Sequence, residues 1–247
     1  METLLTADFT GDYVSSRRLV NACPEARYHV TDHPKPPPSK VLVTHGDTPL
    51  DKAQFERLDD SQIKLWLAQN LVHSASKLRS FPVGIANEEH DPVLGNTETF
   101  QRMLRKPKAN RNLLLMAFRD DTNPQRADLR RLLAGRPFVT TVDYDRSTKG
   151  HALYAKAIYD HSFVLSPPGN GIDCVRTWET LYLRSVPIVK RHPAMDFARH
   201  LPILFVESWE QVLDIPFLED EHKKLSRMPC DFSLMRLSYW IDTINSL

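Results

Sequence analysis

The sequence predicts an α/β protein with two parallel sheets, and three observations support this fold class. Short apolar runs recur along the chain, as expected for strands that are covered on both faces. Over residues 112–215 these runs alternate with segments of helical spacing, which is typical of a parallel, doubly wound sheet. Basic and helix-breaking residues at 105–108 then separate this series from an earlier one, so we expect two α/β units.

The composition is that of a globular protein. The 247 residues are 41% apolar and 26% charged, which excludes a disordered chain and suits one large or two ordinary domains. A net charge of +1 indicates no general attraction to nucleic acid or to anionic membranes. Three widely spaced cysteines favour neither a disulfide framework nor a zinc site. With no leader-like N-terminus and no long apolar run, we expect a cytoplasmic protein without a membrane span.

The first unit is expected over residues 1–100. A proline-marked loop at 34–38 precedes a buried strand at 40–44, and residues 51–62 indicate only a connector. Residues 63–70 fit either a strand or a short helix, and residues 78–85 are strand-like. A helical segment at 97–104 then leads to the boundary.

The second unit is expected over residues 108–230, followed by a C-terminal helix at 231–247 that packs on a domain surface. A capping box at Ser208 and Gln211 predicts a helix start there. The expected strands are 112–118, 138–142, 162–165, 186–189 and 203–206, and the expected helices are 125–133, 151–159, 177–183 and 194–199.

One glycine-bearing loop carries the strongest chemical signal. Residues 166–174 join a predicted strand to a predicted helix, so their backbone N–H groups and the helix N-terminus would favour an anion such as a phosphate. Arg176 and Glu179 follow on one helix face, and they offer a cation and a carboxylate for a nucleotide. An ordinary turn with a solvated Arg–Glu pair is the alternative. Arg119, Arg126 or residues 190–191 would reach the same sheet edge unless they face solvent.

Two further clusters follow predicted strands. His45 and Asp47 are candidates for general acid–base chemistry, although a plain polar turn explains them as well. Asp143-Tyr144-Asp145 has the form of a metal–nucleotide motif, but its polar context favours an exposed turn, and we expect no metal site. The chain lacks the glycine patterns of kinase-type and dinucleotide-binding loops and the serine elbow of hydrolases.

An ordered series of segments resembles the exostosin-like glycosyltransferases, family 47 and its viral and algal relatives. The longest is residues 163–173 (Phe-Val-Leu-Ser-Pro-Pro-Gly-Asn-Gly-Ile-Asp), followed by Arg176, Trp178-Glu179 and residues 186–189 (Val-Pro-Ile-Val). Residues 118–126, with Thr-Asn-Pro-x-Arg, and residues 43–47, 66–70 and 81–87 complete the series across residues 41–190.

The resemblance implies a GT-B-like fold, in which two Rossmann-like domains with parallel sheets face each other across a cleft. It implies transfer of a sugar, with xylose as a candidate, from a UDP-sugar to a glycan hydroxyl with inversion and without a required metal or cofactor. Asp47 or His45 of the acceptor-side domain would be the general base. The donor-binding residues implied by the resemblance are Asn123, Arg126, Ser166, Gly169, Asn170, Gly171, Asp173, Arg176 and Glu179.

The sequence departs from the family pattern at two positions. Arg184 stands where relatives have glycine, and Gly46 stands where they often have asparagine. Two other functions remain open: a GT-A-type transferase that uses Asp143 and Asp145 with manganese, and a non-catalytic module that binds a nucleotide or a glycan.

Overall fold

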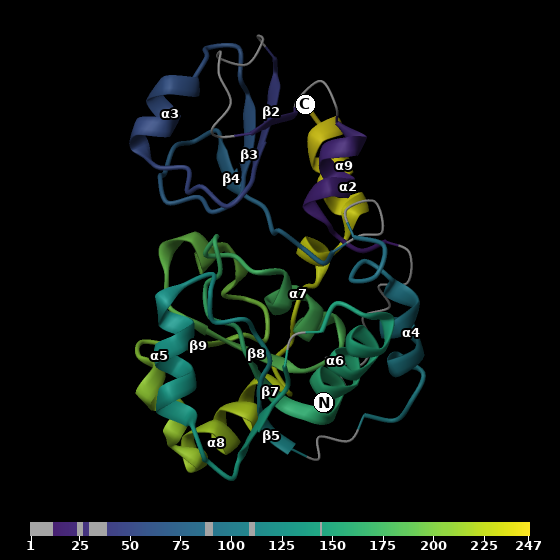
Figure 1. The fold of residues 1–247 in the computed structure, drawn as a ribbon. Helices are drawn as coiled ribbons and strands as arrows, with labels where there is room; N and C mark the ends of the chain where they lie inside the picture. The colour runs from purple at the N-terminus through teal and green to yellow at the C-terminus, as the bar shows by residue number, and fades with distance from the viewer. Residues whose placement is uncertain (1–11, 24–26, 30–38, 87–90, 109–111, 144) are drawn as a thin grey trace.

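The structure, a computed structural model, describes residues 12–23, 27–29, 39–86, 91–108, 112–143 and 145–247. The proline-marked loop at 34–38 and Tyr144 lie outside these ranges. Two parallel sheets, of four and five strands, make a mixed α/β structure consistent with a Rossmann-like fold (Figure 1). The predicted α/β class with parallel sheets is therefore confirmed. None of the helices in the described ranges is both long and apolar enough to cross a bilayer.

The smaller sheet has the strand order β1-β2-β3-β4. Its strands are Arg27–His29, Val41–His45, Leu65–Ala68 and Leu78–Ser80. All four residues of β3 are buried, which selects the strand over the short helix at 63–70. The helix α3 (Lys52–Leu58) follows β2, where the sequence indicated only a connector. Only Leu58 of α3 is buried, so this helix has little apolar periodicity, and Asp51 begins it by accepting the Gln54 N–H at 2.9 Å.

The larger sheet has the strand order β6-β5-β7-β8-β9, which changes direction between β5 and β7. In open α/β sheets the carboxyl edge at such a switch point is the usual ligand site. The strands β5 to β9 are Asn112–Met116, Val139–Thr141, His161–Leu165, Val186–Lys190 and Leu204–Val206. The helices α5, α6 and α7 are Pro124–Leu133, Thr148–Asp160 and Val175–Tyr182.

Alternate side chains of the central strands β5 and β7 pack in two separate hydrophobic cores. Leu114 and Phe163 pack with Leu129 of α5 on one face of the larger sheet. Their neighbours Leu115 and Val164 pack on the opposite face, with α6 and α7. Because both faces are covered, these strands are uninterrupted apolar runs in the sequence.

The segments after β8 pack on both faces of the larger sheet, with Met195 in one core and Trp209 in the other. A 3₁₀ helix, Pro193–Ala198, precedes β9, and a second one, Trp209–Leu213, begins with the predicted capping box of Ser208 and Gln211. The helix α8 (Ile215–Leu225) was not predicted, because Leu218 is its one fully buried residue.

The C-terminal helix α9 (Leu237–Asn245) packs on the smaller sheet rather than on the larger one. It lies beside α2 (Ser16–Ala22) in Figure 1. Trp240 of α9 is buried in one cluster with Leu19 and Leu67, and its ring meets the Phe81 ring edge-on at 6.1 Å between centroids. The two ends of the described chain therefore share one core.

The two positions that depart from the family pattern both have positive φ. Arg184 follows the last turn of α7 at φ 61°, a left-handed conformation that glycine adopts without steric cost. Gly46 follows β2 at φ 113°, which no residue with a β-carbon adopts readily. The glycine that the resemblance leads one to expect at position 184 thus has a conformational reason. In this chain the Nε atom of Arg184 is buried without a partner among the described residues.

Candidate functional site

A cavity of about 410 Å³ opens at the carboxyl edge of the larger sheet, at the switch point between β5 and β7. The loops that follow these two strands contribute Thr122 and Gly169, and α7 contributes Arg176. Asp47 and Val83, which follow strands of the smaller sheet, line the same cavity. Its volume lies in the range of small-molecule sites.

The glycine loop is closed against the protein rather than open. The Gly169 N–H donates to the Gly171 carbonyl at 2.9 Å, and the N–H groups of Ile172 and Asp173 donate to Asn70 Oδ1 at 3.0 and 2.9 Å. The expectation that the N–H groups of this loop point at a ligand is thus wrong for these three residues, because protein acceptors use them. The start of α7 differs, since its N-cap residue Cys174 makes no side-chain capping bond.

Close packing explains both glycines of this loop. A β-carbon on Gly169 would lie 2.8 Å from Arg126 Nη2. A β-carbon on Gly171 would lie 2.9 Å from Asn70 Nδ2 and 3.1 Å from Asp47 Oδ1. The loop is therefore fitted between Arg126 of α5 and the turns that follow strands of the smaller sheet.

Arg176 is a cavity-lining cation with unused donors. Its Nε donates to the Ala117 carbonyl at 2.8 Å, and its guanidinium lies 5.6 Å from the Phe118 ring centroid. Its Nη1 is shut off from solvent and has no hydrogen-bond partner among the described residues. A buried N–H group without an acceptor is costly, and an anion in the cavity would pair with it.

Arg126, in contrast, is occupied by the scaffold. Its guanidinium donates to the carbonyls of Pro168 at 2.8 Å, Arg119 at 3.1 Å and Pro167 at 3.4 Å. It is buried, and burial together with the nearby charge of Arg176 lowers its pKa. Arg126 therefore shapes the loop and adds positive charge to the cavity wall.

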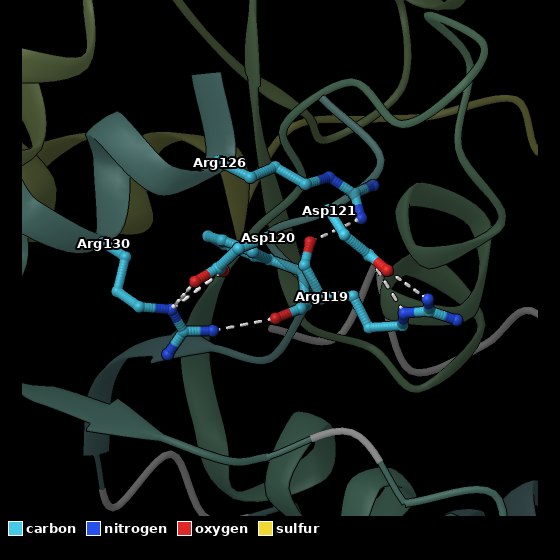
Figure 2. A network of polar contacts seen from close by, with 6 residues as sticks. Arg119, Asp120, Asp121, Arg126 and Arg130 are labelled. Atoms are coloured by element: carbon cyan, nitrogen blue, oxygen red, sulfur yellow. Dashed lines mark hydrogen bonds and ion pairs between the residues drawn. The ribbon is translucent and has the colours of Figure 1, made fainter. Parts of the chain in front are cut away.

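Figure 2 shows how the other cations of this region are paired. Arg119 forms an ion pair with Asp121, and Arg130 forms one with Asp120 at 2.7 Å. Neither Arg119 nor Arg130 lines the cavity; they border a separate shallow hollow with Phe118. The expectation that Arg119 reaches the phosphate region is thus not supported by its position.

Glu179 and Tyr154 form the next part of the cavity wall. Tyr154 Oη donates to Glu179 Oε2 at 2.7 Å, from α6 to α7. Burial raises the pKa of both groups, and Arg176 opposes this effect on each. Tyr154 was not predicted, although its place on one face of α6 with His151, three residues earlier, was a usable signal.

Asp173 links the glycine loop of the larger sheet to a segment that follows the smaller sheet. Its Oδ2 accepts the Val83 N–H and its Oδ1 accepts the Trp178 Nε1–H, both at 2.7 Å. Burial raises the pKa of Asp173 to about 7, while hydrogen bonds from Val83, Trp178 and Cys174 act in the opposite direction. Its carboxylate is therefore committed to the protein, although the residue lines the cavity.

Two other predicted donor-binding residues lie behind the cavity wall. Asn123 caps α5 through its Oδ1 and donates from Nδ2 to the Gly169 carbonyl at 3.1 Å. The hydroxyl of buried Ser166 pairs with the Thr177 hydroxyl at 2.8 Å. Neither residue lines the cavity, so their polar atoms hold the loop in shape.

Of the two candidate bases, Asp47 is the one that reaches the cavity. Asp47 is exposed and lines it, whereas His45 ends β2 and is not among the lining residues. Asn70, the last residue of the motif at 66–70, holds this turn by donating from Nδ2 to the Gly46 carbonyl at 2.9 Å.

Asp143 and Asp145 also line the cavity, on the side of β6. Asp145 accepts the backbone N–H and the hydroxyl of Ser147 at 2.8 and 2.9 Å, and these bonds lower its pKa. Across the described ranges, no group of three or more His, Cys, Asp or Glu side chains is placed to hold a metal ion.

Unpaired polar atoms gather at this cavity. Six buried side-chain atoms lack a hydrogen-bond partner within the described part of the chain, and three of them belong to cavity-lining residues: Thr122, His151 and Arg176. Buried polar groups in folded proteins are normally paired, so this concentration indicates a place for a polar ligand.

No protein-family model matches this sequence, and its comparison with curated proteins gives no significant similarity. The resemblance to exostosin-like glycosyltransferases thus rests on the motifs alone.

Proposed function

We propose that the protein is a nucleotide-sugar-dependent glycosyltransferase whose donor, a UDP-sugar, binds in the cavity at the switch point of the larger sheet. The observation that carries this proposal is Arg176, a cavity-lining cation whose Nη1 is buried without an acceptor among the described residues. A diphosphate supplies paired anionic oxygens to such a group. The two parallel sheets agree with the GT-B-like arrangement that the motifs imply.

The remaining parts of a donor follow from what lies beside Arg176. Glu179 accepts the Tyr154 hydroxyl through Oε2, and its second oxygen is a candidate acceptor for the ribose hydroxyls. The start of α7 adds the partial positive charge of a helix N-terminus near the phosphates. Arg126 contributes further positive charge without giving up its bonds to the loop carbonyls.

In the proposed reaction the bond between the anomeric carbon and the β-phosphate oxygen breaks as an acceptor hydroxyl oxygen bonds to that carbon. The electron pair leaves with the nucleoside diphosphate, and Arg176 and the α7 N-terminus stabilise its charge. The proton of the acceptor hydroxyl passes to Asp47, which lines the cavity from the opposite unit. The acceptor is a glycan hydroxyl, and xylose is the proposed donor sugar.

The direct test is UDP binding by calorimetry in wild type and in Arg176→Ala. Loss of a charge-assisted bond predicts affinity about tenfold to a hundredfold weaker in the variant. Arg131→Ala is the matched control, because Arg131 is exposed on α5, pairs with Asp128 and does not line the cavity. Equal UDP affinity in Arg176→Ala and wild type, with both folded by circular dichroism, would falsify the donor site.

A further inference from the structure

His151 is a buried side chain at the cavity that the proposed reaction does not use. It lies in the first half of α6, it is only 2% exposed, and it lines the cavity. Its Nε2 is shut off from solvent and has no hydrogen-bond partner among the described residues. A buried ring nitrogen without a hydrogen bond costs stability, so packing alone does not explain a histidine at this position.

The surroundings of His151 favour an uncharged ring. The Phe100 ring packs against it at 5.3 Å between centroids, with an interplanar angle of 65°. Burial lowers the pKa of His151, and the negative charge of Asp91 opposes this only in part. Asp91 itself is occupied, since it accepts the N–H groups of Val93 and Leu94 and pairs with Arg146. A neutral imidazole offers one donor and one acceptor, which suits an uncharged polar group.

The position of His151 along the cavity follows from α6. His151 and Tyr154 are three residues apart, so they are neighbours on one helix face, with β-carbons roughly 5–6 Å apart. Tyr154 contacts Glu179, which lies three residues after Arg176 on α7. The wall therefore runs from the cation, through the Glu179–Tyr154 pair, to the imidazole.

We propose that His151 recognises the nucleoside half of the ligand by a hydrogen bond from its imidazole. This inference rests on the proposed function, which assigns the diphosphate to Arg176 and the ribose to Glu179. Along the cavity wall from Arg176 through Glu179 to His151, the next group of the bound nucleotide after the ribose is the nucleobase. The transferred sugar lies on the other side of the diphosphate, toward Asp47.

The test compares UDP with inorganic pyrophosphate as ligands for wild type, His151→Phe and His151→Gln. His151→Phe keeps an aromatic ring against Phe100 and removes both nitrogens, whereas His151→Gln restores a donor and an acceptor. We expect His151→Phe to weaken UDP binding about tenfold and to leave pyrophosphate binding unchanged, with partial recovery in His151→Gln. Thermal unfolding of each variant without ligand reports on folding.

Three results would overturn the inference while leaving the donor site in place. The first is unchanged UDP affinity in His151→Phe. The second is an equal loss of affinity for UDP and for pyrophosphate. The third is a loss of affinity for UDP-xylose alone, with UDP affinity unaffected. The last result would assign His151 to the transferred sugar. Failure of the wild type to bind either UDP or pyrophosphate is a different outcome, because it removes the proposed function and this inference together.

Discussion

Asn70 Oδ1 accepts the backbone N–H of Asp173 at 2.9 Å, across 103 positions of sequence. The same oxygen takes the Ile172 N–H, while Nδ2 of Asn70 donates to the Gly46 carbonyl. One buried amide thus holds the strand-end turn of the smaller sheet against the glycine loop of the larger one. Asn70 has φ 49°, a conformation that asparagine tolerates better than most residues.

Replacing this amide should loosen the glycine loop. Asn70→Gly keeps the backbone conformation accessible and removes only the side chain, leaving two buried N–H groups unpaired. We expect the free energy of unfolding to fall by about 1–3 kcal/mol and UDP affinity to fall with it. Urea denaturation and calorimetry measure the two effects. Unchanged stability would show that the Asn70 bonds contribute nothing net.

Asp47→Asn should separate binding from transfer. Loss of the general base predicts transfer about a hundredfold to ten-thousandfold slower, with UDP affinity unchanged. Product formation from UDP-xylose with a glycan acceptor measures the rate. Asp128→Asn, an exposed carboxylate on α5 away from the cavity, is the control. A wild type that binds UDP but transfers no sugar to any acceptor would instead favour the non-catalytic module.

Asp173 should make stability depend on pH in a defined range. Burial raises its pKa from 3.8 to about 7, so between these values the folded chain holds a proton that the unfolded chain releases. The stabilisation that Asp173 gives the folded state is therefore complete below about pH 4, and it is lost as the pH rises toward 7. The stability of wild type minus that of Asp173→Asn should fall across this range, by up to roughly 4 kcal/mol. A difference that stays constant with pH would contradict it.

Arg184→Gly should stabilise the protein. The left-handed conformation at this position costs a residue with a β-carbon roughly 1–2 kcal/mol, and glycine removes that cost. We expect a higher Tm and about 1 kcal/mol more stability in urea. Gly135→Ala is the reverse control: Gly135 has φ 71° with open space for a β-carbon, so only conformation opposes the change. A lower Tm for Arg184→Gly would mean that the arginine side chain stabilises the fold by more than the left-handed backbone conformation destabilises it.

Asp143→Ala tests the metal-dependent alternative. We expect UDP affinity and transfer rate to stay within about twofold of wild type, with and without a chelator, because Asp145 is held by Ser147 and protein cations are proposed to neutralise the diphosphate. Strict dependence on manganese, lost in Asp143→Ala, would favour the GT-A-type transferase.

Local patterns predicted the parts of the fold that local physics determines. The apolar runs at 112–118 and 162–165 correspond to β5 and β7, because strands covered on both faces are mostly apolar. The helices α3 and α8 were missed since each buries a single residue fully.

The same limit applies to the site. Gly169, Arg176 and Glu179 lie near one another in sequence, and all three line the cavity. Asn70 and Tyr154 act through partners 25 to 103 positions away, and no spacing rule reports such contacts. The sequence also does not distinguish a residue that lines the cavity from a residue, such as Ser166, that only holds the glycine loop in shape.

The packing of α9 on the smaller sheet has a consequence for synthesis. The larger sheet and the helices α5 to α8 occupy one continuous stretch, 112–225, and Ile85, Phe100 and Met235 from outside it join one of its two cores. The core of the smaller sheet includes Trp240 of α9, which follows the whole of the larger sheet in the chain. This core can therefore be completed only after the larger sheet has been synthesised.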